Sequence, residues 1–201
     1  AGISDYFDLD FESEVAIEID PRFIDLKKLS CLKKLGFNRL SFGIQDFSEK
    51  VQESINRFHS FELVSALFKD VRKVGFENIN IDLIYGLPNQ TMERFQKTIE
   101  QVFQLKPSRI ALYSFAHIPQ VVSHQKLIKD DELPSPSVKL DLFMYARNEF
   151  EKLGYLAIAM DHFALPSDPL ADAFENQSLH RNFMGYTTRP ADEFIGLGYS
   201  S

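Results

Sequence analysis

The sequence predicts an α/β fold in which parallel strands and helices form part of a TIM-like (β/α) barrel. Short runs of alternating apolar residues are separated by longer runs with apolar residues at helical spacing, the pattern of strand–helix units in series. Such units form a parallel sheet with right-handed crossovers. Three helices end alike, with a lysine, a glycine cap and an aromatic residue that leads into a strand: Lys34-Leu35-Gly36-Phe37, Lys73-Val74-Gly75-Phe76 and Lys152-Leu153-Gly154-Tyr155.

The number of strand–helix units determines how much of a barrel can form. The sequence shows about five such units, too few for a closed eight-stranded barrel, so we expect a truncated one. No Gly-x-Gly-x-x-Gly follows a strand, which disfavours a dinucleotide-binding Rossmann sheet. We expect residues 1–160 to form the partial barrel and residues 161–201 to form an irregular extension toward a further C-terminal region.

Each element has its own signal. Strands are expected where apolar side chains alternate, at 15–19, 39–45, 79–84, 109–115 and 155–160. Helices are expected at 23–35, 48–55, 60–74, 91–104 and 137–153. Ser60 and Thr91 are N-caps, and Pro21 and Pro107 separate strands from helices. Residues 117–136 are predicted to form a long loop.

Composition narrows the class of protein. The chain has 201 residues, 44% of them hydrophobic, which is enough for one domain with a sizeable core. A net charge of -7 argues against a nucleic-acid surface as the main function. The apolar runs are far shorter than the ~20 residues of a membrane span, and one cysteine excludes a disulfide framework, so a cytoplasmic setting is expected. The chain starts at Ala1 and ends mid-pattern, which suggests a piece of a longer protein.

The second face of the predicted strands is polar. Glu18, Gln45 and Asp82 lie opposite the apolar residues of their strands, toward the carboxyl ends where barrel sites are built. A lumen packed only for stability would carry branched apolar residues. This face therefore favours a polar ligand. The alternative, in which Asp82 is held by a hydrogen-bond network in the fold, stays open.

Several separated motifs carry a family resemblance, in order from about residue 14 to the end. The chain resembles radical SAM enzymes, and more closely the oxygen-independent coproporphyrinogen III oxidase (dehydrogenase) family. The motifs are Val15-Ala16-Ile17-Glu18-Ile19-Asp20-Pro21-Arg22, residues 38–47, Asn56-Arg57, residues 80–88, Leu133-Pro134-Ser135-Pro136, Met160-Asp161-His162-Phe163 and His180-Arg181-Asn182-Phe183.

The resemblance implies a radical SAM barrel that uses S-adenosylmethionine (SAM) and a [4Fe-4S] cluster. The family oxidatively decarboxylates two propionates of coproporphyrinogen III to vinyl groups, giving protoporphyrinogen IX in haem biosynthesis. It also implies an electron donor for the cluster and a monomer. By the family's motifs, the residues that contact SAM would be Glu18, Gln45, Arg57, Asp82 and Ala116, with Arg181 and Phe183 at the substrate.

Departures from the family pattern are equally informative. The cluster motif Cys-x3-Cys-x2-Cys and the Gly-Gly-Gly-Thr-Pro loop are absent, and the single Cys31 is expected to be a small buried helix residue with no metal. Met184 replaces a family glutamine. We therefore expect an internal fragment that is inactive alone. The alternatives are a related haem chaperone, disfavoured because the chain has no Trp, and a degenerate inactive fragment.

Other polar residues have competing interpretations. His59, His117 and His124 lack metal-ligand spacing and are expected in loops. His162, beside Asp161 at a strand end, could equally be a site residue or structural. Residues 180–188 have no clear period and are expected to fold over the barrel mouth near Asp82 or simply to pack on the barrel. The scattered cations could meet substrate carboxylates but are more often solvated: Lys126, Lys129 and Arg181.

Overall fold

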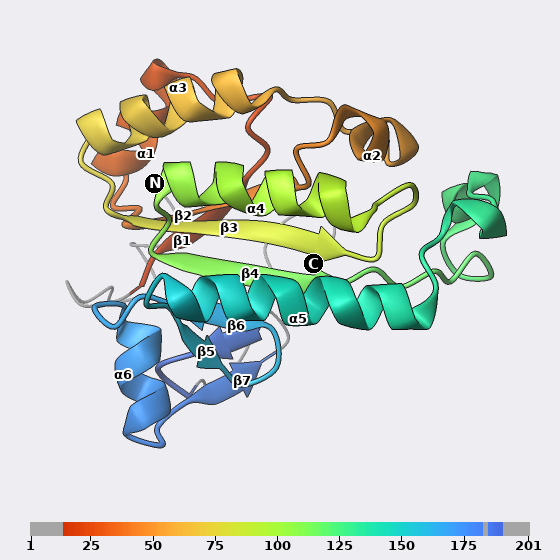
Figure 1. Cartoon of the computed structure of the whole chain (residues 1–201). Coiled ribbons are helices and arrows are strands. Elements are labelled where there is room, and N and C mark those ends of the chain that lie inside the picture. The colour runs from red at the N-terminus through yellow and green to blue at the C-terminus, as the bar shows by residue number, and fades with distance from the viewer. Residues whose placement is uncertain (1–13, 183–184, 191–201) are drawn as a thin grey trace.

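A computed structural model describes residues 14–182 and 185–190 of the chain. Its main feature is a six-stranded sheet with the order β1-β2-β3-β4-β6-β5. The first four strands run parallel to their neighbours, in chain order: β1 (Ala16–Ile19), β2 (Arg39–Gln45), β3 (Asn78–Tyr85) and β4 (Arg109–Ser114). The predicted parallel α/β fold is thus confirmed, and Figure 1 shows the four strands side by side.

Helices connect the parallel strands and cover one face of the sheet (Figure 1). Residues predicted as N-caps accept hydrogen bonds from the first turn, at Ser60 for α3 and Thr91 for α4. The loop predicted at 117–136 holds two short 3-10 turns, η2 (Ser123–Leu127) and η3 (Asp130–Glu132). The helices are α1 (Leu26–Lys34), α2 (Glu49–Ser54), α3 (Phe61–Lys73), α4 (Met92–Leu105), α5 (Pro136–Lys152) and α6 (Pro169–Glu175).

The core lies between the sheet and these helices. The apolar sets predicted to face the helices are fully buried on β2 and β3, where they pack with α3 and α4: Leu40, Phe42, Ile44, Ile79, Ile81, Leu83, Val64, Phe68, Phe95 and Ile99. The two sides of the parallel strands therefore differ as predicted, with one side packed against helices and the other left for polar groups.

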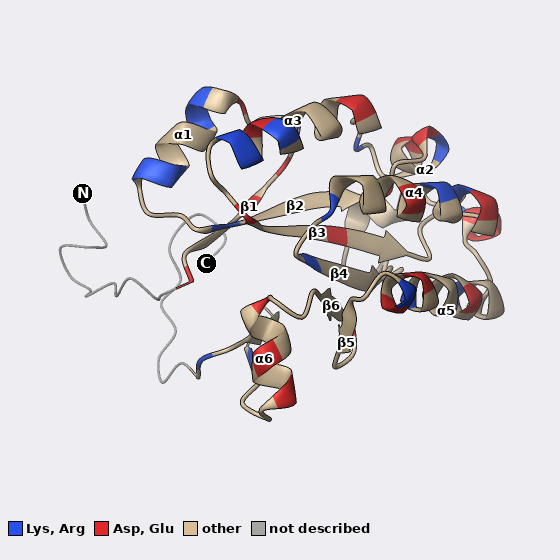
Figure 2. Cartoon of the chain, turned by 60° about the vertical axis from the view of Figure 1, so that its left-hand side comes forward, with Lys and Arg blue, Asp and Glu red and all other residues tan. Residues whose placement is uncertain are grey.

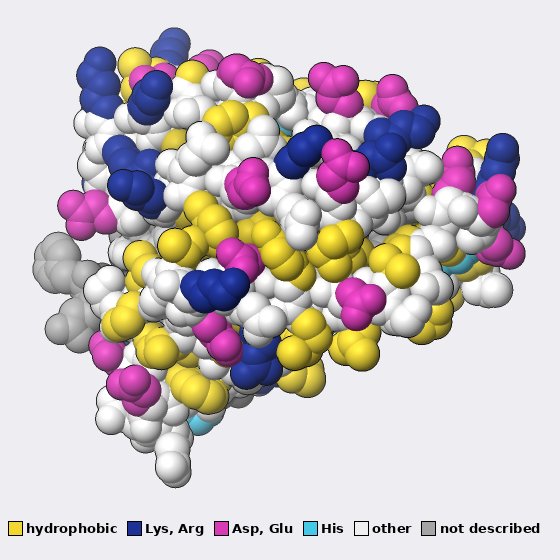
Figure 3. All heavy atoms as spheres, viewed as in Figure 1, with side chains coloured by type: hydrophobic (Ala, Val, Ile, Leu, Met, Phe, Trp, Pro, Cys, Tyr) yellow, Lys and Arg dark blue, Asp and Glu magenta, His cyan; other side chains and the backbone are white. Residues whose placement is uncertain are grey.

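Charged residues lie mainly on the helices and connections, whereas the strands carry few (Figure 2). On the face that presents α4 and α5, acidic and basic side chains are interspersed with apolar ones (Figure 3). No helix within residues 14–182 or 185–190 is long and apolar enough to cross a membrane.

The strand predicted at residues 155–160 is present and joins the sheet, but the prediction that it pairs in parallel with the other strands was wrong. β5 (Leu156–Ile158) lies at the sheet edge and pairs only with β6 (His162–Ala164), which runs antiparallel to both β5 and β4. The reversal occurs because the chain turns back at Ala159, which adopts a φ of 52°. The parallel series therefore ends at β4.

The segment after residue 160 is more regular than predicted. It contributes β6 to the sheet, the helix α6 that Asp168 caps, and a hairpin of β7 (His180–Asn182) and β8 (Gly185–Thr187). A three-residue strand has too few residues to show a period, which explains why residues 180–188 looked irregular in the sequence. Residues 183, 184 and 191–201 lie outside the described residues.

Candidate functional site

The polar face of β2 and β3 carries a hydrogen-bonded group around Asp82. Ser41 donates its hydroxyl to Asp82 Oδ2 at 2.9 Å, and Asn80 Nδ2 donates to Asp82 Oδ1 at 2.8 Å. Asn80 Nδ2 also donates to Ser41 Oγ at 2.7 Å. Strand pairing explains the cluster, because Ser41 lies opposite Asn80 in the register and Gly43 lies opposite Asp82.

Asp82 is held in a setting that disfavours its charge. Burial raises the pKa of this carboxyl to about 6, and the bonds from Ser41 and Asn80 only partly oppose the effect. The nearby negative charge of Glu18 raises the pKa further, whereas Arg57 lowers it. The hydrogen-bond network that the sequence analysis left open for Asp82 is thus present, but it does not fully offset the burial of the carboxylate, and a polar ligand at Asp82 stays a prediction.

Gln45 and Arg57 come together over Gly43. β2 has a register irregularity between Gly43 and Gln45, and Gln45 adopts a φ of 69°. A Cβ atom at Gly43 would lie 3.1 Å from Gln45 Nε2 and 3.3 Å from an Arg57 guanidinium nitrogen. Glycine therefore lets both side chains lie close to the sheet, beside Asp82. Gln45 Oε1 is buried and has no hydrogen-bond partner among the described residues.

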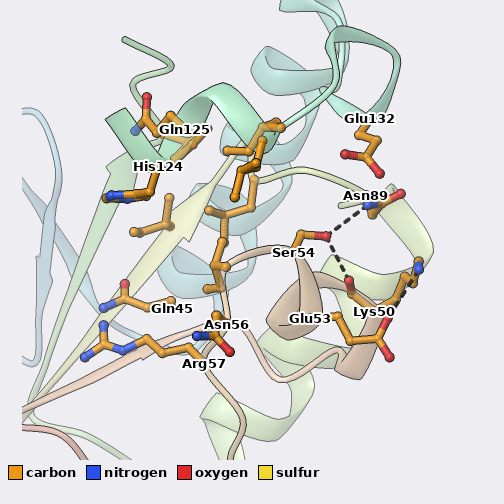
Figure 4. Close-up of a pocket in the computed structure, with 16 residues that line it drawn as sticks. Gln45, Lys50, Glu53, Ser54, Asn56, Arg57, Asn89, His124, Gln125 and Glu132 are labelled. Carbon is orange, nitrogen blue, oxygen red and sulfur yellow. Dashed lines mark hydrogen bonds and ion pairs between the residues drawn. The ribbon is translucent and has the colours of Figure 1, made fainter. Parts of the chain in front are cut away.

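A cavity of about 820 Å³ opens at the carboxyl ends of β2, β3 and β4, a size suited to a small molecule. Figure 4 shows Gln45 and Arg57 side by side on one wall, with His124 and Gln125 from the η2 turn across from them. Apolar lining comes from Ile84 and neighbouring residues. Sequence reasoning did not assign His124 to this wall, because nothing local in the 117–136 loop shows which way it folds.

A carboxylate also lies beside Arg57. Asp20 Oδ2 is 3.5 Å from an Arg57 guanidinium nitrogen, and it bonds Arg22 at 2.6 Å. The Arg22 bond is the main cause that lowers the pKa of Asp20 to about 2, so Asp20 is a fixed negative charge. Arg57 is therefore oriented by Asp20 while its side chain stays partly exposed toward the cavity.

Sequence reasoning missed Asp46, which ties two loops of the site together. This fully buried carboxylate accepts bonds from Gln90 Nε2 at 2.7 Å, Thr98 Oγ1 at 2.8 Å and the Ser48 backbone N–H at 2.6 Å. Gln90 in turn accepts from the Gly86 N–H at 2.6 Å. The residue after Gln45 is thus anchored to the loop after β3. Burial raises the pKa of Asp46 despite these bonds.

The remaining predicted residues are less tightly gathered. Glu18 is exposed on β1, and its charge acts on Asp82. Ala116 follows β4, and its carbonyl accepts a bond from Gln125 Nε2 at 3.0 Å. Arg181 is exposed on β7 with its guanidinium over the Tyr186 ring. Phe183 and Met184 lie outside the described residues.

The histidines differ in their burial and in the side chains that they contact. His59 is buried beside Phe47, and desolvation lowers its pKa to about 4, so it is a neutral packing residue. His117 stacks on Phe115. His162 is buried, and its Nδ1 lies 2.7 Å from Asp161 Oδ1. The lysines predicted as scattered cations, Lys126 and Lys129, are exposed.

Tyr113 links these groups across the sheet. Burial, followed by the negative charges of Asp82, Asp161 and Glu18, raises the pKa of the Tyr113 hydroxyl to about 12. Its ring also meets the His162 ring edge to face, at 6.0 Å between centroids. The polar face therefore continues from β1 as far as β6.

The chain's own residues do not fit an iron–sulfur cluster. Clusters need several thiolates, and the sequence has one cysteine. Contrary to the prediction, Cys31 is exposed, because it lies on the outer side of α1 away from buried Leu29. Within residues 14–182 and 185–190 no three His, Cys, Asp or Glu side chains converge as metal ligands.

The residues on the polar face do fit a ligand such as SAM. Carboxylates at Glu18 and Asp82 can accept from hydroxyl and amino groups, and the Arg57 guanidinium can pair with a carboxylate. Gln45 offers a buried acceptor with no partner among the described residues.

Comparison with known proteins shows which proteins this chain resembles. Residues 6–102 match the model of the radical SAM superfamily. The chain is 45% identical to the oxygen-independent coproporphyrinogen III oxidase of Escherichia coli K12 over 195 residues, which cover 97% of this chain and 43% of that enzyme. The Synechocystis enzyme of the same name is 41% identical over 199 residues, 99% of this chain and 43% of the enzyme.

The structures agree with the sequences. The solved coproporphyrinogen III oxidase of Escherichia coli, described as a radical SAM enzyme, superposes with a TM-score of 0.93 at 44% identity. The match covers 98% of this chain and 46% of that one, so the chain spans less than half the length of these relatives. By sequence and by structure the chain is similar over nearly its whole length to the oxygen-independent coproporphyrinogen III oxidases, and residues 6–102 match the model of the radical SAM superfamily.

Proposed function

We propose that this chain supplies the SAM-binding face of a radical SAM oxidoreductase that acts on coproporphyrinogen III. The reaction would convert two propionate side chains to vinyl groups, each with release of CO2, transfer of one hydrogen atom to a radical derived from SAM and transfer of one electron to an acceptor, giving protoporphyrinogen IX. The observation that carries the proposal is the convergence of Gln45 and Arg57 over Gly43, next to Asp82, at the carboxyl ends of parallel strands. The names of the relatives support the choice of substrate.

Each residue has a role that follows from its contacts. Arg57 would pair with the methionine carboxylate of SAM, because its partly exposed side chain lines the cavity and Asp20 holds one side of the guanidinium. Asp82 and Glu18 would accept from the amino group and the ribose hydroxyls, and Gln45 would use its buried carbonyl oxygen. Ala116 would contact the ligand through its backbone. Bound SAM supplies the hydrogen-abstracting radical of this chemistry.

The substrate side and the setting complete the proposal. Arg181 and Phe183 would meet the macrocycle, with Arg181 binding a propionate. A single cysteine suits a reducing compartment, so we place the enzyme in the cytoplasm, as a monomer served by an electron donor. We keep residues 1–160 as the barrel part and the rest as an extension.

Replacing Arg57 tests the SAM site. In a form of the protein that includes the family's cysteine motif, Arg57→Ala should weaken SAM binding by about 1.5–3 kcal/mol, the worth of a hydrogen bond between charged groups. Equilibrium dialysis with radiolabelled SAM measures the change.

Arg22→Ala is the matched control for this test. It removes the other arginine that pairs with Asp20, but Arg22 is not among the residues that line the cavity. SAM affinity should stay within about threefold of the wild type. Equal affinities of Arg57→Ala and wild type would remove Arg57 from the site, and equal losses in both variants would show that Asp20, not the ligand, accounts for the effect.

Cluster assembly gives a second test. After anaerobic treatment with iron and sulfide, this chain should hold no stoichiometric [4Fe-4S] cluster, because one thiolate cannot ligate it. Visible absorbance and iron analysis measure the outcome, with Cys31→Ser as control. A cluster that forms in the wild type and is lost in Cys31→Ser would show that Cys31 binds it across two chains.

A further inference from the structure

A small group of side chains connects the β7–β8 hairpin to the polar face, and the SAM-binding roles do not use it. The group consists of Asp161 and His162 at the start of β6, Tyr113 on β4, and Arg181 and Tyr186 on the hairpin. It joins the parallel part of the sheet to the residues proposed to meet the substrate.

His162 is at the centre of the group. Its ring meets Tyr113 edge to face at 6.0 Å and Tyr186 edge to face at 5.2 Å, so it lies between β4 and the hairpin. Gly185 also packs on the ring, where an added Cβ would lie 3.7 Å from His162 Cε1. Gly185 adopts a φ of 124°, so the hairpin needs glycine at this contact.

Asp161 fixes the ring. Its Oδ1 lies 2.7 Å from His162 Nδ1, while its backbone carbonyl accepts from the Leu112 N–H at 2.7 Å. Burial lowers the pKa of His162 even though Asp161 opposes this, so near neutral pH the ring is uncharged and donates from Nδ1 to the carboxylate. The ring plane is thus set by a residue bonded to β4.

The β7–β8 hairpin connects the oriented His162 ring to Arg181. Arg181 and Tyr186 face each other in the register, and the guanidinium carbon lies 5.1 Å from the Tyr186 ring centroid. Tyr186 also packs against the small apolar cluster of β5, β6 and α6. The positive charge of Arg181 also lowers the pKa of the Tyr113 hydroxyl, although burial and the nearby carboxylates raise that pKa by more.

We propose that His162, oriented by Asp161, is a positioning residue that fixes the β7–β8 hairpin and thereby places Arg181, over the Tyr186 ring, for binding a substrate carboxylate. The assignment of Arg181 to the substrate rests on the proposed function, whereas the positioning of the hairpin does not. The two parts can be tested separately.

Limited trypsinolysis of this chain tests the positioning. Trypsin cleaves after Arg181, and mass spectrometry follows that one bond. His162→Ala should raise the cleavage rate about fivefold, because loss of an aromatic pair favours local opening. His162→Phe should restore most of the protection, since it keeps the ring contacts, and His117→Ala should change nothing.

One outcome would overturn the positioning role, and a second variant covers the case in which His162→Ala does not fold. Unchanged cleavage in His162→Ala would overturn the proposal. If circular dichroism shows that His162→Ala does not fold, Asp161→Ala replaces it in the test, because Asp161 is partly exposed. Asp161→Ala alone should speed cleavage after Arg181. Added to His162→Phe, it should have no further effect.

Ligand binding tests the functional part, in a form of the protein that includes the cysteine motif. The probe is coproporphyrin III, the stable oxidised analogue of the proposed substrate, followed by fluorescence. Arg181→Ala and His162→Ala should each weaken its binding about tenfold, the worth of a charged contact, and the double variant should be no weaker than either. SAM affinity should be unchanged in all three.

The outcomes separate the two hypotheses. Additive losses in the double variant would show that His162 does not act through Arg181 and would overturn the positioning role. Unchanged coproporphyrin III binding in Arg181→Ala would overturn the substrate role of Arg181. The trypsinolysis experiment alone would then decide whether His162 fixes the hairpin. Loss of SAM binding in His162→Ala would mean general disruption and would also overturn the proposal.

Discussion

Asp168→Ala is expected to lower the free energy of unfolding by about 3–5 kcal/mol, because it removes the buried carboxylate that pairs with two buried arginines. Asp168 Oδ1 accepts from Arg109 at 2.6 Å, and Asp168 Oδ2 lies 3.1 Å from Arg39, without hydrogen-bond geometry. The side chain of Asp168 is fully buried. Arg39 and Arg109 begin β2 and β4, and the variant leaves them the exposed Glu14, at 2.8 Å from Arg39 and 3.7 Å from Arg109, in place of a buried carboxylate. Urea unfolding followed by circular dichroism measures the loss.

Two comparisons sharpen this prediction. Asp172→Ala, at an exposed position of the same helix α6, should change stability by about 0.5 kcal/mol or less. A similar loss in both variants would show that the ion pairs add nothing to the general cost of altering α6.

The pH dependence of Asp168 has a definite sign. Burial raises its pKa, but Arg109 and Arg39 outweigh burial, and the pKa is lowered overall. A carboxyl with a depressed folded pKa contributes stability above its unfolded pKa and loses it as the pH falls through the folded value. The gap between wild type and Asp168→Ala should therefore be complete near pH 7 and should shrink below about pH 4.

Asp82→Asn is expected to raise stability near pH 7 while weakening SAM binding. The folded pKa of Asp82 is about 6 against a model value of 3.8. Since one pKa unit is worth about 1.4 kcal/mol, charging this carboxyl in the fold costs up to about 3 kcal/mol. The amide oxygen of the variant can accept from Asn80, and its NH2 group can donate to the Ser41 hydroxyl oxygen once that hydroxyl turns, so we expect a gain of about 1–3 kcal/mol.

The direction of the pH dependence again follows from the linkage between proton binding and folding. A raised folded pKa means that wild-type stability is fully present below about pH 4 and is lost as the pH rises through about 6. The unfolding curves of Asp82→Asn and wild type should therefore converge near pH 4 and separate above pH 6. Asp141→Asn, on the exposed side of α5, should show no such separation. A wild-type protein as stable as the variant at pH 8 would mean that Asp82 is well compensated.

The parallel part of the fold could be predicted because each signal was local and repeated. Alternation placed Ile79, Ile81 and Leu83 on the helix side and left Asp82 on the other, and glycine caps marked helix ends. Parallel strands also bring their carboxyl ends to one edge, so Gln45 and Asp82 could be grouped without coordinates.

What was missed depended on contacts distant in sequence. Asp46 looks like an ordinary loop carboxylate until Gln90 and Thr98, 44 and 52 positions later, meet it. Cys31 was misjudged because its residue type was weighed above its position: the face that α1 turns to the core follows Leu29 and Leu32, and Cys31 lies off that face. Strands of three residues, such as β6, are too short for any periodicity to register.

The reversed direction of β6 changes which end of a strand can supply the mouth of the site. Residues that follow β2, β3 and β4 lie at that edge, whereas on β6 it is the preceding turn that reaches it, since Asp161 bonds Leu112 and His162 lies opposite Ala111. A change of length between Ala159 and Asp161 would thus move one flank of the mouth and leave the other flank in register. Under the proposed function, the flank assigned to the substrate could then change in length without disturbing the flank assigned to SAM.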